Sequence, residues 1–303
     1  MNEIGKKITQ KLIEIYGSAD FVIGFLPYKR SMWNSMASVY EECLNAGAVA
    51  YILPLPYYLM PDKTEVCERD LFTNALPIDL LGKITFDFLV IHYPYDGKNK
   101  VTKMLPAYYT AELRNYGDKI IYIPYSCTNI PQLRVQPGIA NVDYAFLGSE
   151  WQATAFINEW QKYGVDFTGR AFGYGSPKMD AIQKLKHKDS DIKTALVTTS
   201  LAPFLYEPFV RFEKYKTVMQ DALNSGYNVI FRPHPLFRQT IRSMRPDTEI
   251  AYEGLFLWMQ KRNIRIDESE DLEEALSQAD ILISDPSSVL EMWQSTGREY
   301  RII

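Results

Sequence analysis

The last third of the chain contains a polar cluster directly after a short apolar run. Residues 279–291 read ADILISDPSSVLE, so an apolar strand is followed by Ser284, Asp285 and the pair Ser287 and Ser288. We expect that pair to begin a helix, where unpaired backbone N–H groups and the helix dipole favour an anion. These residues therefore predict a phosphate site, although Ser287 could equally serve only as a helix N-cap.

A second apolar run of the same half also ends in residues that suit an anion. Residues 228–235 read NVIFRPHP, which places Arg232 and His234 just after a predicted strand. The two prolines stiffen the turn, and arginine offers a planar fork of donors to phosphate. Because strands of a parallel sheet end at one edge, where ligands bind, the two clusters together predict a pyrophosphate site.

Two acidic residues complete this predicted binding site. Glu291 lies one helical turn after the serine pair, where its carboxylate could accept a hydrogen bond from a ribose hydroxyl. Asp285 could orient His234 or bind a ligand hydroxyl. The alternatives are a plain helix surface for Glu291 and a turn residue for Asp285.

The first half contains the candidate for proton transfer. His92 follows the apolar run 86–91, and an imidazole titrates near neutral pH, as a general base requires. Asp96 is the second candidate, and Tyr93 and Tyr95 would line the acceptor site. Against this interpretation, a histidine at a strand end is more often structural than catalytic.

Alternating strand and helix patterns must position these residues. Short apolar runs alternate with longer amphipathic stretches along the whole chain, which predicts an α/β protein with parallel sheets. Among these elements we expect a helix capped by Ser149, a strand over 194–198, and helices over 106–116 and 208–224, whereas residues 60–81 show little periodicity. A charged stretch without apolar periodicity, residues 184–193, is expected to link two Rossmann-like domains. We place these domains at residues 1–186 and 187–303, with strand ends of both facing a cleft.

Composition and charge exclude several classes of protein. The chain has 303 residues, 47% of them hydrophobic and 23% charged, which is a normal globular balance. A formal net charge of −4 argues against a nucleic-acid partner. Three scattered cysteines and three histidines predict neither a metal site nor disulfides, and favour a reducing, cytoplasmic location.

The sequence also lacks the signatures of several common sites. No GxGxxG or GxxxxGKS motif occurs, so neither a nicotinamide fingerprint nor a P-loop is indicated. We therefore expect no cofactor, with leaving-group charge stabilised by protein cations and dipoles. The N-terminus has no long apolar core and predicts neither a signal peptide nor a membrane span. Peripheral membrane association through a basic or aromatic face of the first half is still open.

At this point the sequence resembles a known family. The motif RPHP at residues 232–235, followed about fifty residues later by SDPSSVLE at 284–291, is similar to the CDP-glycerol glycerophosphotransferases of teichoic-acid synthesis. Four segments of the first half resemble one branch of that family: FLPYKRSMWNSMASVYEEC (25–43), IHYPYDG (91–97), IIYIPY (120–125) and GYGSPKMD (173–180).

The resemblance implies a fold, a reaction and a donor site. The family has the two-domain GT-B layout and moves glycerol phosphate from CDP-glycerol to a hydroxyl, releasing CMP without an obligatory metal. The acceptor would be a polymer or glycolipid of the cell wall or surface, reached from the inner face of the membrane. The resemblance implies that five residues hold the CDP moiety: Arg232, His234, Ser287, Ser288 and Glu291.

Two departures from the family pattern qualify this expectation. Family members have a His-Gly pair in the first half whose histidine is taken as the base, whereas this chain has Tyr125, Ser126 and Cys127 at the strand end where we expect that pair. His92 could substitute for it. The family also continues beyond the helix that follows the serine pair, so we expect the second domain to be truncated.

Two other functions are compatible with the sequence. One is a glycosyltransferase or epimerase of the same layout that uses a UDP-sugar. The other is a non-catalytic nucleotide-binding module, which the missing His-Gly pair favours. Comparing the affinities for UDP and CDP distinguishes an enzyme that uses a UDP-sugar from one that uses CDP-glycerol. Nucleotide binding without CMP release would identify a non-catalytic module.

Overall fold

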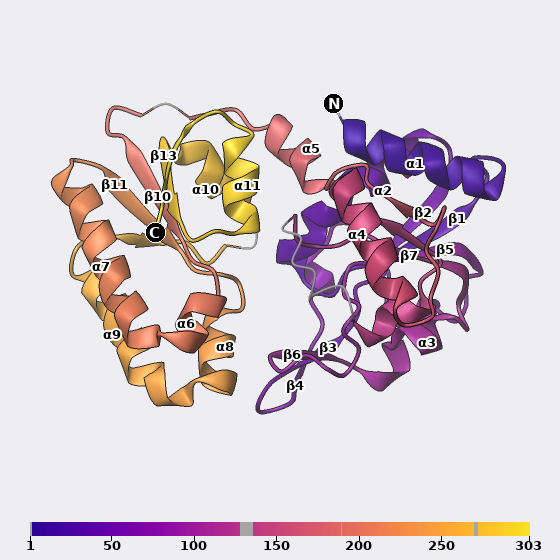
Figure 1. The fold of residues 1–303 in the computed structure, drawn as a ribbon, viewed down its shortest axis with the longest axis horizontal. Helices are drawn as coiled ribbons and strands as arrows, with labels where there is room; N and C mark the ends of the chain where they lie inside the picture. Colours follow the sequence, from indigo (N-terminus) through magenta and orange to yellow (C-terminus); the bar gives the residue numbers. More distant parts are fainter. Residues whose placement is uncertain (1, 128–135, 189, 270–271) are drawn as a thin grey trace. The chain divides into compact units, whose positions relative to one another are not determined.

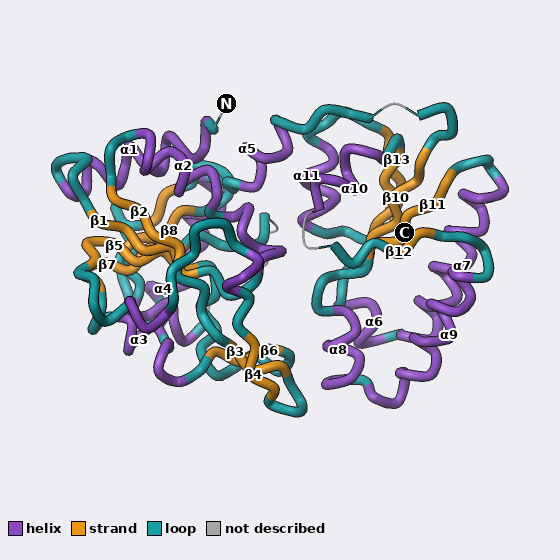
Figure 2. The backbone as a smooth tube through the Cα atoms, turned by 180° about the vertical axis from the view of Figure 1, so that it is seen from behind, coloured by secondary structure: helices purple, strands orange, loops and turns teal. Residues whose placement is uncertain are grey.

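The structure is a computed structural model that describes residues 2–127, 136–188, 190–269 and 272–303. The chain divides into two compact units, Met1–Gln183 and Lys184–Ile303 (Figure 1). This division lies three residues before the boundary expected from the charged stretch. Each unit has a central parallel sheet covered by helices, as the alternating pattern predicted (Figure 2).

Unit 1 is built on six parallel strands. Their order is β2-β1-β5-β7-β8-β9, and each follows a helix or turn that returns the chain to the same end of the sheet. The strands are β1 (Val22–Leu26), β2 (Val49–Ile52), β5 (Phe86–Ile91), β7 (Gly117–Tyr122), β8 (Tyr144–Phe146) and β9 (Ala171–Phe172). The central strands are apolar on both faces because helices cover both sides.

Helices α1 and α2 cover one face of this sheet, and α3 lies on the other (Figure 1). Ile8 and Leu12 of α1 and Val39 of α2 pack with Phe25 and Phe88 of the sheet in one apolar core. The α-helices are α1 (Glu3–Tyr16), α2 (Ala37–Asn45), α3 (Thr110–Leu113), α4 (Glu150–Gln161) and α5 (Lys178–Gln183). Ser149 caps α4 as expected, accepting a hydrogen bond from Gln152 N at 3.3 Å.

The helix expected over residues 106–116 is shorter in the structure. A single 3-10 turn, Pro106–Tyr108, is followed by Tyr109 in extended conformation (ψ 150°), and α3 begins only at Thr110. Asp96 accepts hydrogen bonds from both the backbone N–H and the hydroxyl of Thr110, at 3.1 and 3.2 Å. The contact with Asp96 holds Thr110 at the first position of α3, so a tertiary interaction determines where this helix begins.

Part of the irregular stretch at residues 60–81 joins a small antiparallel sheet. Its order is β4-β3-β6, with β3 (Tyr57–Leu59), β4 (Thr64–Val66) and β6 (Thr102–Met104). A buried ion pair, Lys29 Nζ to Glu68 Oε1 at 2.7 Å, ties the loop after β1 to this insertion. The Tyr57 hydroxyl donates to the same Glu68 oxygen at 2.6 Å. Unit 1 also contains short 3-10 helices, among them η1 (Arg30–Ser35), η2 (Arg69–Leu71), η3 (Ile78–Leu80) and η6 (Pro137–Asn141).

Unit 2 has five parallel strands in the order β12-β11-β10-β13-β14. They are β10 (Thr194–Thr198), β11 (Asn228–Arg232), β12 (Arg265–Ile266), β13 (Ile281–Ser284) and β14 (Glu299–Ile302). The last strand pairs in parallel with β13. Strands β10, β11 and β13 lie where their apolar runs predicted.

Helices cover both faces of this second sheet. Helices α7 and α9 lie on one face and α10 and α11 on the other (Figures 1 and 2). The helices are α6 (Ala202–Tyr206), α7 (Pro208–Asn224), α8 (Phe237–Met244), α9 (Glu249–Gln260), α10 (Leu272–Gln278) and α11 (Ser288–Gln294), with the 3-10 turn η7 (Pro246–Thr248). An aromatic core containing Phe204, Tyr215, Phe231 and Tyr252 holds α6, α7 and α9 on the sheet.

Candidate functional site

Three strands of unit 2 end at the same level of the sheet. The registers place Thr198 of β10 beside Arg232 of β11 on one side and beside Ser284 of β13 on the other. The two polar clusters, about fifty residues apart in sequence, are therefore neighbours at the carboxyl edge. Strand β10 lies between their two strands, and the clusters lie at the edge where α/β sheets bind ligands.

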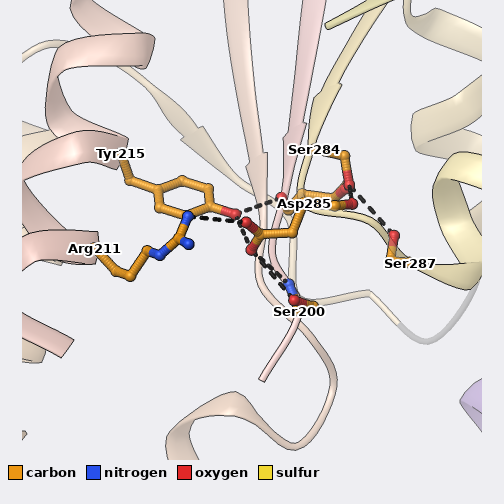
Figure 3. A network of polar contacts seen from close by, with 7 residues as sticks. Ser200, Arg211, Tyr215, Ser284, Asp285 and Ser287 are labelled. Atoms are coloured by element: carbon orange, nitrogen blue, oxygen red, sulfur yellow. Dashed lines mark hydrogen bonds and ion pairs between the residues drawn. The ribbon is translucent and has the colours of Figure 1, made fainter. Parts of the chain in front are cut away.

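Asp285 is the centre of a polar network at this edge (Figure 3). Its carboxylate is buried and accepts hydrogen bonds from the Tyr215 hydroxyl at 2.7 Å and from the backbone N–H and hydroxyl of Ser200 at 3.2 and 3.3 Å. Arg211 Nη1 lies 3.4 Å from its other oxygen. A buried carboxylate needs such donors, since an uncompensated charge in the interior is costly. Asp285 thereby joins the loops after β10 and β13 to helix α7.

A chain of hydroxyls runs beside this carboxylate. Thr198 Oγ1 donates to Ser284 Oγ at 2.7 Å, and the Ser284 hydroxyl donates to the Asp285 carbonyl oxygen at 2.7 Å. Ser287 Oγ lies 3.3 Å from Ser284 Oγ and accepts from Leu290 N at 3.3 Å. Ser287 is therefore the N-cap of α11, and any ligand contact it makes is additional to that structural role.

The other two predicted residues of α11 lie nearer the surface. Ser288 opens the helix and is half-buried, and Glu291 lies in the first turn with its side chain exposed. The geometry is compatible with contact to a ligand at the strand ends. Their roles in binding stay predictions.

Arg232 is occupied by a neighbouring loop of its own unit. Its Nη1 pairs with Asp267 Oδ2 at 2.7 Å and with Ser269 Oγ at 3.0 Å, and its Nη2 donates to the Ser269 carbonyl at 2.8 Å. Its side chain is only 7% exposed, and that of Asp267 is 13% exposed. The Arg232 charge, which the sequence predicts to bind a phosphate, is therefore balanced by the Asp267 carboxylate.

Two hydrogen bonds, each donated by a backbone N–H group, position His234. Its N–H donates to Thr199 Oγ1 at 3.1 Å, and its ring Nδ1 accepts from Leu236 N at 3.1 Å. Because Nδ1 is an acceptor, a neutral His234 ring has its proton on Nε2. The half-buried imidazole is a candidate donor to a phosphate oxygen at this edge.

His92 in unit 1 is buried completely and satisfied on both ring nitrogens. Tyr28 N donates to Nε2 at 3.3 Å, which makes Nε2 an acceptor and places the proton on Nδ1, 3.2 Å from Ser35 Oγ. The Ser35 hydroxyl donates in turn to Met32 O at 2.8 Å. Burial, with a smaller contribution from the Lys178 charge, lowers the pKa of His92 to about 3. This geometry favours a structural histidine, and its assignment as the base stays a prediction.

Asp96 also has a structural contact. Its two oxygens receive the Thr110 N–H and hydroxyl, as described above, and its own backbone has a positive φ of 50°. Burial raises the pKa of Asp96, while the two Thr110 hydrogen bonds oppose that shift. Near it, Tyr95 and Tyr125 bring their hydroxyl oxygens within 3.2 Å of each other at the ends of β5 and β7.

Sequence reasoning missed the partners that come from helices and later loops. Arg211 and Tyr215 lie on α7, and Asp267 follows β12; none lies near a motif. A helix face carries no local signal that it will meet a residue 70 or more positions away in the chain. The hydroxyl residues Thr198 and Ser200, at the end of β10, were the sequence signal that lay closest to these missed partners.

Unit 1 contains a groove of its own. A groove of about 670 Å³ on unit 1 runs between α1 and α2, with Lys6, Lys7, Lys11, Glu14 and Glu42 among its lining residues. No group of three His, Cys, Asp or Glu side chains within the described ranges converges as metal ligands would. No helix in that part of the chain combines the length and apolarity that a membrane span requires.

Comparison with known proteins bears on both the family and the fold. The sequence model of the family described as CDP-Glycerol:Poly(glycerophosphate) glycerophosphotransferase matches residues 127–294, more than half of the chain. That segment contains the three strand ends and the Asp285 network. No curated protein matches the sequence at a significant level.

Similar solved structures show a two-domain fold of the GT-B type. The S. aureus MnaA–UDP co-structure has a TM-score of 0.57 at 12% identity, covering 93% of this chain and 79% of that one. A UDP-GlcNAc 2-epimerase of Methanocaldococcus jannaschii, with UDP-GlcNAc and UDP, reaches 0.56 at 12% identity, with 89% and 80% coverage. The wall teichoic acid polymerase TagF soaked with CDPG reaches 0.52 at 12% identity, with 100% and 78% coverage. At such identities the likeness concerns the fold, and the predicted cleft between the units stays a prediction.

Proposed function

The chain belongs to the CDP-glycerol:poly(glycerophosphate) glycerophosphotransferase family, and we propose that it transfers glycerol phosphate from CDP-glycerol to a polymer hydroxyl. One observation carries this proposal for the site. The family match contains β10, β11 and β13, whose register brings Thr198, Arg232 and Ser284 to one edge. The donor would bind at that edge.

The proposed reaction is a displacement at phosphorus. The acceptor hydroxyl oxygen attacks the β-phosphorus of CDP-glycerol, the bond between this phosphorus and the bridging oxygen breaks, and CMP leaves with that oxygen. The proton of the hydroxyl passes to a base or to water. Donors aimed at the diphosphate stabilise the charge that develops on CMP. Of the predicted residues, His234, Ser287 and Ser288 offer the donors that fit this role.

The proposed reaction also needs a proton acceptor. His92 and Asp96 stay the candidates that the sequence named, and both have structural contacts. If either acts as the base, it must leave those contacts when the acceptor binds. The His92 experiment in the Discussion separates the two roles.

The acceptor and location are likewise proposals. The family's description points to a poly(glycerophosphate) chain, and a glycolipid or another surface polymer is the wider class. We place the protein in the cytoplasm, at the inner face of the membrane. A reducing compartment is supported by Cys43, Cys67 and Cys127, none of which forms a disulfide with another described residue. Fractionation of cells that produce the protein would test this location.

Two measurements test the function. Calorimetry should detect binding of CMP, CDP and CDP-glycerol, and weaker binding of UDP and UDP-N-acetylglucosamine. Incubation with CDP-glycerol and a poly(glycerol phosphate) acceptor should then release CMP and lengthen the polymer. Preference for UDP ligands would support the UDP-sugar alternative, and CDP-glycerol binding without CMP release would support a non-catalytic module. Absence of any cytidine nucleotide binding would overturn the proposal.

A further inference from the structure

We propose that Arg211 of helix α7 supplies the cation that meets the diphosphate of the bound donor. No motif of the sequence contains this residue. The inference rests on the proposed function, because it names a further binding residue for the same nucleotide donor.

The first step is the charge balance at the carboxyl edge of unit 2. Arg232, the cation expected there, is held by Asp267 at 2.7 Å and by two atoms of Ser269. Removing it from those contacts would leave the Asp267 carboxylate without its cation, at a substantial cost in free energy. The diphosphate of CDP-glycerol carries two negative charges, so a further cation near it would favour its binding.

The second step is the placement of Arg211. It lies four residues before Tyr215 on α7, so the two side chains share one helix face. The Tyr215 hydroxyl donates to Asp285 Oδ2 at 2.7 Å, and its oxygen also lies 3.0 Å from Thr198 O, which fixes this face against the strand ends. The Arg211 guanidinium therefore reaches the same carboxylate, as Figure 3 shows.

The third step is the long distance between Arg211 and Asp285. Its Nη1 lies 3.4 Å from Asp285 Oδ1, longer than the 2.7–2.9 Å of a good charge-assisted bond. The side chain is 22% exposed, three times the exposure of Arg232. Tyr215 and Ser200 both donate to Oδ2 of Asp285, and Arg211 Nη1 faces Oδ1. Arg211 can keep Nη1 beside Asp285 and offer its remaining N–H groups to a phosphate, so the buried carboxylate keeps its cation.

The test compares ligands with and without the second phosphate. Arg211→Gln should weaken binding of CDP-glycerol roughly tenfold to a hundredfold, as loss of a charge-assisted bond implies, and should weaken CMP binding much less. Arg211→Lys keeps the charge but loses the planar fork of donors, so its affinity for CDP-glycerol should lie between those of the wild type and Arg211→Gln. Arg238→Gln is the matched control, because that arginine is exposed on α8 and pairs with Glu253 at 3.3 Å; its affinities should equal the wild type's.

The outcomes separate this inference from the proposed function. If the wild type binds CDP-glycerol and Arg211→Gln binds it equally well, the role of Arg211 is wrong and the transferase function stands. If the wild type binds no cytidine nucleotide, the function itself fails. Thermal melts confirm that each variant is folded. Should the Gln variant not fold, Arg211→Lys decides: wild-type affinity for CDP-glycerol would exclude a bidentate phosphate contact.

Discussion

Tyr215 and Asp285 lie 70 residues apart in the sequence, and their side chains are joined by a hydrogen bond of 2.7 Å at the carboxyl edge of unit 2. The same tyrosine oxygen lies 3.0 Å from Thr198 O, so the two acceptors share one hydroxyl proton. One hydroxyl thus holds a helix, a strand end and the loop that precedes α11. Positions of the proposed donor-binding groups depend on this contact.

We predict that Tyr215→Phe lowers the free energy of unfolding of unit 2 by about 1–3 kcal/mol. The change removes one hydrogen-bond donor from the buried Asp285 carboxylate, and the loss of that hydrogen bond destabilises the folded state. Denaturant titration would measure it. Tyr206→Phe is the control, since that side chain is 83% exposed and should change stability by less than about 0.5 kcal/mol. Equal effects of the two changes would contradict the role given to Tyr215.

We predict that Arg232→Met destabilises unit 2 by about 3 kcal/mol, because it leaves the Asp267 carboxylate beside an apolar group. Thermal unfolding would show a lower midpoint for this unit. Lys188→Met breaks an exposed pair with Glu274, both side chains being 57% exposed, and should leave the midpoint unchanged. If Arg232→Met stays fully stable but loses affinity for CDP-glycerol, the sequence assignment of Arg232 to the phosphate is favoured over a structural one.

The pH dependence of stability should report His92. Its pKa is about 3 in the folded protein and about 6.5 in an unfolded chain. Between these values the unfolded state binds one more proton, so the folded state loses about 1.4 kcal/mol for each unit that pH falls below 6.5. Above that pH the contribution is complete. Unfolding of wild type and His92→Gln at pH 7 and pH 5 measures it: the difference between the two proteins should shrink at pH 5.

The same variant separates a structural His92 from a catalytic one. A structural role predicts that His92→Gln lowers the unfolding free energy at pH 7, while the folded fraction retains most of its rate of CMP release. A base role predicts that the same variant also shows a large fall in the kcat of its folded fraction. Affinity for CDP should stay near the wild-type value in both cases.

Gly173 and Gly254 should respond oppositely to alanine. A Cβ on Gly173 would lie 2.1 Å from Glu150 N and 2.2 Å from Ser149 C, so the first turn of α4 would have to move. We expect Gly173→Ala to destabilise unit 1 by about 3 kcal/mol. Gly254 lies within α9 with nothing inside 4 Å of such a Cβ, and Gly254→Ala should stabilise unit 2 by about 0.5–1 kcal/mol. Thermal melts would distinguish the two, and a tolerated Gly173→Ala would contradict the close packing.

The sequence by itself determined the alternation of elements, the strand ends and the family. Apolar runs such as 194–198 and 281–283 predicted β10 and β13 because burial on both faces leaves a continuous apolar signature. The helix 208–224 was likewise readable from its boundaries. Ser149 was identified as an N-cap because capping depends on residues only three positions apart.

Only the tertiary structure decided which charges are available at the candidate site. Arg232 and His92 look reactive in the sequence, and the fold surrounds them with Asp267, Tyr28 and Ser35. Arg211 looks like an ordinary helix residue, and the fold brings it to Asp285. Burial and ion pairing depend on partners far away in the chain, so a local pattern can name a residue type suited to chemistry without showing what already occupies it.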